Sequence, residues 1–349
     1  MSLGPVMFDL QSTTLTDQEI EMLLHPQTGG VVLFTRNLSS VDQLQELVTQ
    51  IHALREPHLL VAVDHEGGRV QRFKDGFTHL PPANKFGELY QRDQKQARRL
   101  ALITGWLMAK ELRSVGIDFS FAPVLDVAHG VSGVIGDRAF HRNPESVADL
   151  AHHIMSGMRR GGTEAVGKHF PGHGGVKEDS HTALPIDRRR TEDILAEDVL
   201  PFERMIHYGL AGIMPAHVIY PESDPHPAGY SPFWLRDVLR NRLGFQGAVF
   251  SDDLSMEAAH IVGDVPQRAR AALEAGCDMV VICNHPEGAM KALEALGDYE
   301  NNASKVRLAR FHGRKAKSYA QLRNSEDWHQ AVAAITPLLD DSPWLELKV

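Results

Sequence analysis

The sequence has few cysteines and no long apolar run. Only two of its 349 residues are cysteine, Cys277 and Cys283. Two cysteines in one apolar segment are too few for a disulfide framework, so we interpret both as buried thiols. The longest apolar runs, residues 59–63 and 279–283, are far shorter than the roughly 20 residues of a membrane-spanning helix. The sequence therefore predicts neither a disulfide-rich module nor a membrane span.

Positive charge is also in short supply. The chain has 36 Lys and Arg residues against 45 Asp and Glu residues, which gives a formal net charge of -9. Because negative charge repels phosphate backbones and anionic membrane surfaces, we expect neither a nucleic-acid partner nor a membrane partner. The N-terminus lacks a basic segment followed by a long apolar one, so no secretory signal is predicted. We expect a cytoplasmic protein that acts as a monomer.

Short apolar runs, each followed by a polar turn and a helical pattern, recur along the chain. This alternation is typical of parallel strands connected by helices. We predict eight strands, at residues 5–10, 30–35, 59–64, 117–124, 165–169, 212–215, 248–251 and 279–283. Eight such units predict an α/β fold, a closed (β/α)8 TIM-type barrel, whose usual size is about 250 residues.

A doubly wound open sheet is the alternative architecture. Such a sheet usually carries G-x-G-x-x-G after its first strand, whereas Gly172, Gly174 and Gly175 have another spacing and follow the fifth. Because no linker marks a second domain, we predict one catalytic barrel domain over residues 1–349. Its C-terminal helices and tail, from about residue 288, are expected to wrap the barrel, with Trp344 and Leu345 as packing anchors.

Polar side chains follow five of the predicted strands. In a barrel of this kind, the loops at the carboxyl ends of the strands build the active site. The residues at these positions are 64–72 after the third strand, Asp126 and Arg138 after the fourth, 168–181 after the fifth, His217 after the sixth, and Asp252 with Asp253 after the seventh. Any one of them alone would be read as a helix cap or a structural histidine. Their joint placement on one face favours an active site.

The segment after the fifth strand has the most specific pattern. Pro171 and three glycines in four positions predict a mobile loop, and Asp179 and His181 stand two residues apart at its end. Asp179 can accept a hydrogen bond from one imidazole nitrogen of His181. The other nitrogen is then able to donate or accept a proton near neutral pH.

Asp252 ends the seventh strand and follows three apolar residues. We therefore expect its carboxylate to project into the mouth of the barrel, where it would suit a nucleophile that forms a covalent glycosyl intermediate. Asp253 is the competing residue. Strand alternation and the neighbouring Leu254 and Met256 favour a supporting role for it.

Three motifs in this order resemble glycoside hydrolase family 3. They are Lys-His-Phe-Pro-Gly-His-Gly at 168–174 with Asp-Ser-His at 179–181, Asp-His-Glu-Gly-Gly-Arg-Val at 64–70, and Phe-Ser-Asp-Asp-Leu-Ser-Met at 250–256. More narrowly, the chain looks like the single-domain β-N-acetylglucosaminidases (β-hexosaminidases) of bacterial peptidoglycan recycling. The resemblance extends from about residue 4 to about residue 284.

The resemblance implies a retaining exo-hydrolase. Its substrate would be N-acetylglucosaminyl-1,6-anhydro-N-acetylmuramic acid, with or without peptide, from which it removes the terminal β-N-acetylglucosamine. Asp252 matches the nucleophile, and His181, assisted by Asp179, matches the acid/base. The positions that match sugar-holding residues are Asp64, Arg72, Arg138, Lys168 and His169. The chain departs from the wider family at Gly175-Val176, where Asp-Thr is common, and this departure concerns the loop conformation more than the mechanism.

The glycosidase reading requires no metal and no other cofactor, but two other functions stay open. In a metal-dependent barrel hydrolase, one or two ions would be bound by His169, His173, His181, His217 and Asp252. That function leaves the motif at 64–72 without a role. The other is a non-catalytic amino-sugar-binding protein, against which the intact Asp252, Asp179 and His181 argue.

Overall fold

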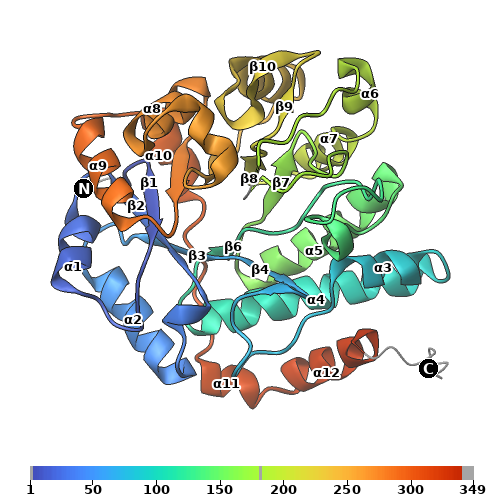
Figure 1. Cartoon of the computed structure of the whole chain (residues 1–349). Coiled ribbons are helices and arrows are strands. Elements are labelled where there is room, and N and C mark those ends of the chain that lie inside the picture. Colours follow the sequence, from blue (N-terminus) through green and yellow to red (C-terminus); the bar gives the residue numbers. More distant parts are fainter. Residues whose placement is uncertain (1–2, 181–182, 340–349) are drawn as a thin grey trace.

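Eight parallel strands form the centre of the molecule in the computed structural model, which describes residues 3–180 and 183–339. The strands are ordered β6-β3-β2-β1-β12-β11-β8-β7. Parallel bridges from Ser120 to Ala165 and from Val124 to Lys168 join the segments of β6 and β7, so the sheet closes on itself. The predicted (β/α)8 barrel is confirmed (Figure 1).

All eight predicted strands are present. Their bounds are β1 (Val6–Asp9), β2 (Thr28–Leu33), β3 (Leu60–Val63), β6 (Phe119–Ser120), β7 (Val166–Phe170), β8 (Gly212–Pro215), β11 (Ala248–Asp253) and β12 (Met279–Ile282). The strand predicted at 117–124 is much shorter than expected, and beyond it Val124 forms an isolated bridge with Lys168. Two short hairpins lie outside the barrel, β4 (His65–Gly67) with β5 (Val70–Gln71), and β9 (Ile219–Tyr220) with β10 (Asp224–Pro227).

Helices follow the barrel strands and cover their outer side (Figure 1). They are α1 (Asp17–Leu24), α2 (Val41–Ala53), α3 (Ala83–Tyr90), α4 (Gln94–Ser114), α5 (Pro144–Gly161), α6 (Thr191–Ala196), α7 (Leu200–His207), the π-helix η4 (Phe233–Arg242), α8 (Val265–Ala275) and α9 (Pro286–Leu296). The start of α5 is fixed locally, since the Asn143 side chain accepts a hydrogen bond from Ser146 N and Pro144 occupies the first turn. Gly162, with φ 109°, ends the same helix in the left-handed conformation.

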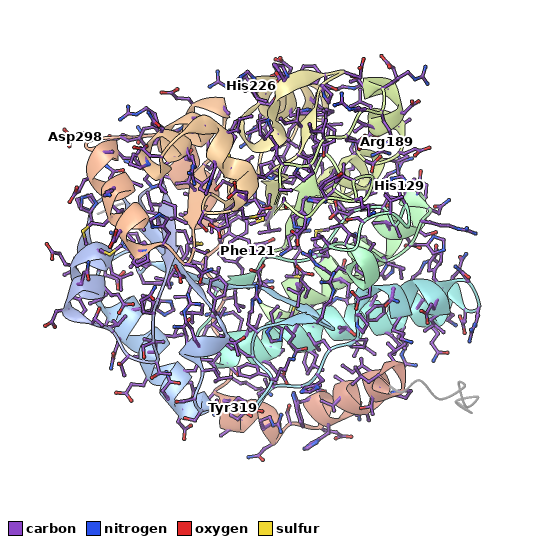
Figure 2. The ribbon with its side chains drawn as sticks, in the orientation of Figure 1. Phe121, His129, Arg189, His226, Asp298 and Tyr319 are labelled. Carbon is purple, nitrogen blue, oxygen red and sulfur yellow. The ribbon has the colours of Figure 1, made fainter. Side chains whose placement is uncertain are left out.

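The alternation of side chains along each strand divides the core into two parts. In β1, Val6 and Phe8 belong to the cluster between strands and helices, whereas Met7 belongs to the cluster inside the barrel. The interior cluster contains a group of aromatic rings, among them Phe119, whose centroid lies 5.3 Å from that of Phe121. Phe121 stands near the centre of the ring of strands (Figure 2). Aromatic packing therefore fills the barrel and gives it a solid floor.

The C-terminal part of the described chain consists of α10 (Asn302–Ala309), α11 (Tyr319–Arg323) and α12 (Glu326–Ile335). The last two helices run beside α4 (Figure 1), where Trp328 Nε1 donates a hydrogen bond to Glu111 Oε1 at 2.8 Å. The predicted anchors Trp344 and Leu345 lie outside the described residues. One domain over the whole chain remains our proposal for its organisation.

The two cysteines are free and buried, as the sequence predicts. Of the helices within residues 3–180 and 183–339, none combines the length and apolar character that crossing a membrane requires.

Candidate active site

Alternate residues of each barrel strand point into the barrel, and this alternation places three ionisable side chains at its carboxyl end. In β3, Leu60 and Ala62 point inward, so Asp64 continues that phase just beyond the strand. The same alternation carries Lys168 after Val166 in β7, and Asp252 after Phe250 in β11. Packing of the barrel interior therefore determines which polar groups reach its mouth.

These three side chains line one cavity of about 540 Å³. The sequence-predicted site residues found on its walls are Asp64, Arg72, Arg138, Lys168, His169, Asp179 and Asp252. His181, the eighth predicted residue, lies outside the described residues. The structure thus brings together every predicted site residue that it describes, from five different segments of the chain.

Lys168 is the electrostatic centre of the cavity. Its Nζ lies 2.8 Å from Asp64 Oδ1 and 2.7 Å from Glu66 Oε1, while the lysine side chain is 3% exposed. Burial disfavours its positive charge, but the adjacent Asp64 and Glu66 outweigh that effect and raise the pKa of Lys168. Lys168 therefore stays protonated and holds two carboxylates in fixed positions.

Glu66 is held from its other side by Arg138. The guanidinium donates from Nε and Nη2 to the two carboxylate oxygens at 2.8 Å each, the paired geometry of a strong ion pair. Burial alone would raise the pKa of Glu66, but Lys168 and Arg138 hold that pKa below its usual range. The result is a charged wall that changes little between acid and neutral pH.

A second anchor lies beneath the loop that follows β7. Asp126 is fully buried, and its Oδ2 lies 2.7 Å from Nδ1 of His169. Its Oδ1 accepts hydrogen bonds from the backbone N–H groups of His169 and His173. Burial opposes the charged form of Asp126, but the two imidazoles and the backbone N–H of His173 outweigh it and lower the pKa. The orientation of His169 is set by this carboxylate.

Asp252 and Asp253 have different hydrogen-bond partners. Asp253 Oδ1 accepts hydrogen bonds from Ser255 N and Cys283 N, both at 2.9 Å, and its Oδ2 accepts one from Ser255 Oγ at 2.7 Å. These bonds tie the end of β11 to the end of β12. Asp252 accepts a hydrogen bond from Asp253 N, and both carboxylates line the cavity and are half-buried.

The glycine-rich start of the loop after β7 is tightly packed, so the expectation of a mobile segment is wrong for Gly172 and Gly174. Both are buried. A Cβ atom at Gly172 would lie 2.6 Å from Asp198 Cβ, and one at Gly174 would lie 1.9 Å from the Val127 carbonyl oxygen. Glycine is required at these positions because neighbouring chain segments leave no space for a side chain.

The far end of the same loop is attached at Ser180. Its hydroxyl lies 3.1 Å from Nε2 of His173, and its carbonyl accepts a hydrogen bond from Ala258 N at the start of the helical turn η5 (Glu257–Val262). Asp179, the residue before it, lines the cavity. The loop therefore delivers its end to the wall of the cavity, beside His173 and Ala258.

The geometry does not support the metal-dependent alternative. Three or more metal-ligating groups converge at two places among the described residues, and neither place includes His169, His173, His217 or Asp252. His217 is fully buried against the backbone, with its Nε2 3.1 Å from the Asp253 carbonyl oxygen. His169 already directs Nδ1 at Asp126. Within the described chain, the proposed ligands thus do not face a common point.

A second cavity, of about 770 Å³, lies at the opposite end of the barrel. Its buried carboxylate, Asp278, is bound by Arg240 at 2.8 Å and by Arg307 at 2.9 Å. Both carboxylate oxygens are thereby neutralised. The buried carboxylate of this larger cavity is therefore not comparable to Asp252 in the smaller cavity at the barrel mouth, since Asp278 is paired with two arginines.

Sequence reasoning did not single out Glu66 as a site residue and gave Asp126 no role beyond its position after a strand. Glu66 stands in the motif at 64–72, but its partners Lys168 and Arg138 are 102 and 72 residues away along the chain. A signal was available for both residues. Each is a carboxylate two residues after a predicted apolar strand, and a carboxylate is costly to bury without a cationic or hydrogen-bonded partner.

Comparisons with known proteins agree with this geometry. The model of the glycosyl hydrolase family 3 N-terminal domain matches residues 6–310. The chain belongs to this family. It is 65% identical to the beta-hexosaminidase of Thioalkalivibrio sulfidiphilus over 349 residues, 100% of each chain, and 53% identical to that of Methylobacillus flagellatus over 333 residues, 95% of each chain.

Solved structures of the family superpose closely on the barrel. NagZ of Neisseria gonorrhoeae, in complex with N-trifluoroacetyl-D-glucosamine, has a TM-score of 0.93 and 42% identity, covering 97% of this chain and 99% of that one. The beta-N-acetylhexosaminidase of Beutenbergia cavernae has a TM-score of 0.76 and 29% identity, covering 96% and 95%. The protein is thus a glycoside hydrolase, and the non-catalytic binding protein considered above is set aside.

The partial desolvation of the Asp253 carboxyl predicts a pH-dependent stability. Burial raises the pKa of Asp253 from 3.8 to about 6 in the folded protein. Its contribution to stability is fully present below pH 4 and is lost as the pH rises through 6. Relative to Asp253→Asn, whose Oδ1 keeps both backbone hydrogen bonds, the wild-type free energy of unfolding should fall by up to about 3 kcal/mol over this interval.

Urea denaturation of both proteins between pH 4 and pH 7.5 measures this difference. Asp298→Asn is the control, because Asp298 is exposed at the surface (Figure 2) and should show no such trend. A wild type that gains stability relative to Asp253→Asn as the pH rises would contradict the assignment.

Proposed function

We propose that this glycoside hydrolase removes a single N-acetylglucosamine residue from the non-reducing end of its substrates, with retention of the β configuration. The observation that carries the proposal is the position of Asp252, a carboxylate on the wall of the cavity that the Asp64, Lys168 and Glu66 network also lines. The names of the relatives, beta-hexosaminidases, support the same sugar class. So does the N-acylated glucosamine bound to NagZ of Neisseria gonorrhoeae.

The shape of the cavity suits removal of one terminal sugar. Its apolar lining residues Val32, Phe121, Met214 and Val281 all belong to the cluster that fills the barrel interior. The cavity is therefore closed below, and a chain cannot pass through it. A volume of about 540 Å³ is within the range of small-ligand pockets, roughly 300 to 1,000 Å³.

The charged wall is suited to hold sugar hydroxyls. Asp64 and Arg72 are partly exposed to the cavity, with 23% and 34% of their side chains accessible. Adjacent hydroxyls of a pyranose match paired acceptors and donors on such side chains. We assign sugar binding to Asp64, Arg72, Arg138, Lys168 and His169. Because Lys168 and Arg138 fix the carboxylates beforehand, little ordering is needed when the sugar binds.

In the proposed reaction, an oxygen of Asp252 attacks the anomeric carbon of the sugar as the bond to the leaving oxygen breaks. His181 gives a proton to that oxygen, so the aglycone leaves as an alcohol and a glycosyl ester remains on Asp252. His181 then takes a proton from water, whose oxygen displaces the ester. Two displacements at one carbon restore the original configuration.

Asp179 is proposed to orient His181. It stands two residues before the histidine on the loop whose end is attached through Ser180, and it lines the same cavity. A carboxylate that accepts a hydrogen bond from the N–H of an imidazole fixes the tautomer of that imidazole and raises its basicity. Asp179 thereby supports proton transfer without contacting the reacting atoms.

For the aglycone we propose 1,6-anhydro-N-acetylmuramic acid, with or without its peptide, in the cytoplasm. The muramic acid carries a lactyl carboxylate or, with peptide, further carboxylates. Arg69 and Arg72 both line the mouth of the cavity, with 48% and 34% of their side chains exposed. Arg69 lies 2.9 Å from Asp137 and Arg72 lies 3.7 Å from Asp64. The exposed parts of both guanidinium groups can donate hydrogen bonds to the carboxylate of such an aglycone.

Hydrolysis of p-nitrophenyl β-N-acetylglucosaminide, with the β-glucoside as control, tests the reaction and the sugar class together. We expect kcat/KM for the N-acetyl sugar to exceed that for glucose by at least about 100-fold, since a buried polar site discriminates strongly against a missing group. Cleavage of the anhydro-disaccharide, followed by chromatography, tests the aglycone. Equal rates on both aryl glycosides would argue against the assigned specificity.

Substitution of Asp252 tests the nucleophile. Asp252→Asn should lower kcat by more than about 10⁴-fold, because the amide cannot form the ester, while sugar binding stays close to wild type. A 5-fluoro glycosyl donor should label the wild-type protein on one residue, identified by mass spectrometry. A label on Asp253, or no label at all, would overturn the assignment of Asp252.

Substitution of His181 tests the acid/base. General acid catalysis contributes typically ~10²- to 10⁴-fold and matters most for poor leaving groups. His181→Ala should therefore slow cleavage of the natural disaccharide far more than cleavage of an activated aryl glycoside. Asp179→Ala should show the same pattern more weakly. If His181→Ala slowed both substrates equally, the residue would have a structural role only.

A further inference from the structure

Three histidines and one aspartate meet at the end of the barrel opposite the active site. His52 lies in the last turn of α2, His58 stands two residues before β3, and Asp118 stands directly before β6. His312 comes from the segment after α10. Four separate parts of the chain thus converge where strands β3 and β6 begin, a face that in this fold serves stability rather than catalysis.

The ligand atoms of His52, His58 and Asp118 have the spacing of metal ligands. Nε2 of His52 lies 3.4 Å from Asp118 Oδ2, and Nε2 of His58 lies 3.8 Å from Asp118 Oδ1. Nδ1 of His312 lies 3.0 Å from His58 Nε2. Ligand atoms of His52, His58 and Asp118 all lie within 4.8 Å of one another. Two nitrogens that bind one tetrahedral zinc ion at 2.0–2.1 Å are about 3.3 Å apart.

The hydrogen bonds of Asp118 leave one acceptor position directed toward the histidines. Its Oδ1 accepts from Arg113 Nη1 at 3.0 Å and from Gly313 N at 2.9 Å, while its Oδ2 accepts from Val61 N at 2.9 Å. A carboxylate offers about four lone-pair positions. Three are used by these donors, and the fourth belongs to Oδ2, the oxygen nearest His52.

Two imidazole nitrogens of the group are buried without a hydrogen bond among the described residues. They are Nε2 of His52 and Nε2 of His312. The separation of 3.4 Å between His52 and Asp118 is a close approach that lacks hydrogen-bond geometry. Buried polar atoms are rarely left without a partner. A metal ion between His52 and Asp118 would accept a lone pair from the imidazole nitrogen and one from the carboxylate oxygen.

We propose that His52, His58 and Asp118 bind one zinc ion that fastens these three segments together, with His312 as the neighbour of His58. Imidazole nitrogens with a single carboxylate oxygen are ligands typical of Zn²⁺. Arg113, Val61 and Gly313 orient the carboxylate from behind, as second partners of metal ligands do. The ion would stabilise the end of the barrel where β3 and β6 begin, and it would take no part in hydrolysis.

A second cluster of potential ligands provides a matched control. His129 and Asp198, with Glu197, also lie within 4.8 Å of one another. There the groups are already paired, since His129 Nε2 lies 2.9 Å from Asp198 Oδ1 and Arg189 Nη1 donates to Asp198 Oδ2 at 2.7 Å. The adjacent arginine occupies the place of a cation. His129→Gln changes only this second cluster, so zinc binding at the cluster of His52, His58 and Asp118 should stay unchanged.

Zinc binding to the EDTA-treated, desalted full-length protein tests the proposal. Isothermal titration and native mass spectrometry with ZnCl2 should show one tightly bound ion in the wild type and in His129→Gln. His52→Gln and His58→Gln should each weaken that binding about 100-fold or more, as loss of a ligand exceeds the effect of losing its orienting partner. Zinc should raise the melting temperature of the wild type but not that of His58→Gln.

The variants chosen avoid the buried Asp118, whose removal would leave Arg113 unpaired in the core. His52 and His58 are 23% and 33% exposed, so glutamine can be accommodated, and circular dichroism together with the zinc-free hydrolysis rate checks that folding is intact. Absence of tight zinc binding in the wild type would overturn the proposal. So would zinc binding of equal strength in the wild type, His52→Gln and His58→Gln.

Discussion

The alternation of side chains along eight strands that close into a ring is the constraint on which the rest of the structure depends. Every second residue must fill the barrel interior, and the others must meet the surrounding helices. The inward phase ends in Asp64, Lys168 and Asp252 at the carboxyl edge. A shift of one residue in any of these strands would exchange core and site together, so the packing that stabilises the barrel also positions its polar mouth.

Burial of Lys168 explains why so many charges gather at one wall. A buried ammonium group is tolerated only beside carboxylates, and here Asp64 and Glu66 supply them. Glu66 in turn requires Arg138, which comes from a loop far away in the sequence. Each charge therefore fixes the next one. The resulting network keeps its ionisation over a wide pH range, since the lysine pKa is raised and the glutamate pKa is lowered.

The fold and most of the site could be predicted from sequence because both follow short-range patterns. Short apolar runs, each followed by a polar turn and a helical pattern, marked all eight strands, and the polar residues at the ends of three of these runs gave Asp64, Lys168 and Asp252. Glu66 and Asp126 were not assigned roles because their importance depends on partners far away along the chain. The loop glycines show the same limit. Gly174 suggested mobility in the sequence, whereas its contact with the Val127 carbonyl is visible only in three dimensions.

The closed floor formed by Phe121 and Met214 imposes an order on traffic through the cavity. In the proposed reaction, the terminal sugar enters first and lies against this floor, with the rest of the substrate toward the mouth of the cavity. That remainder leaves before water displaces the sugar, so the sugar is the last group to leave. The packing that closes the barrel thus makes the first group to enter the cavity the last one to leave it.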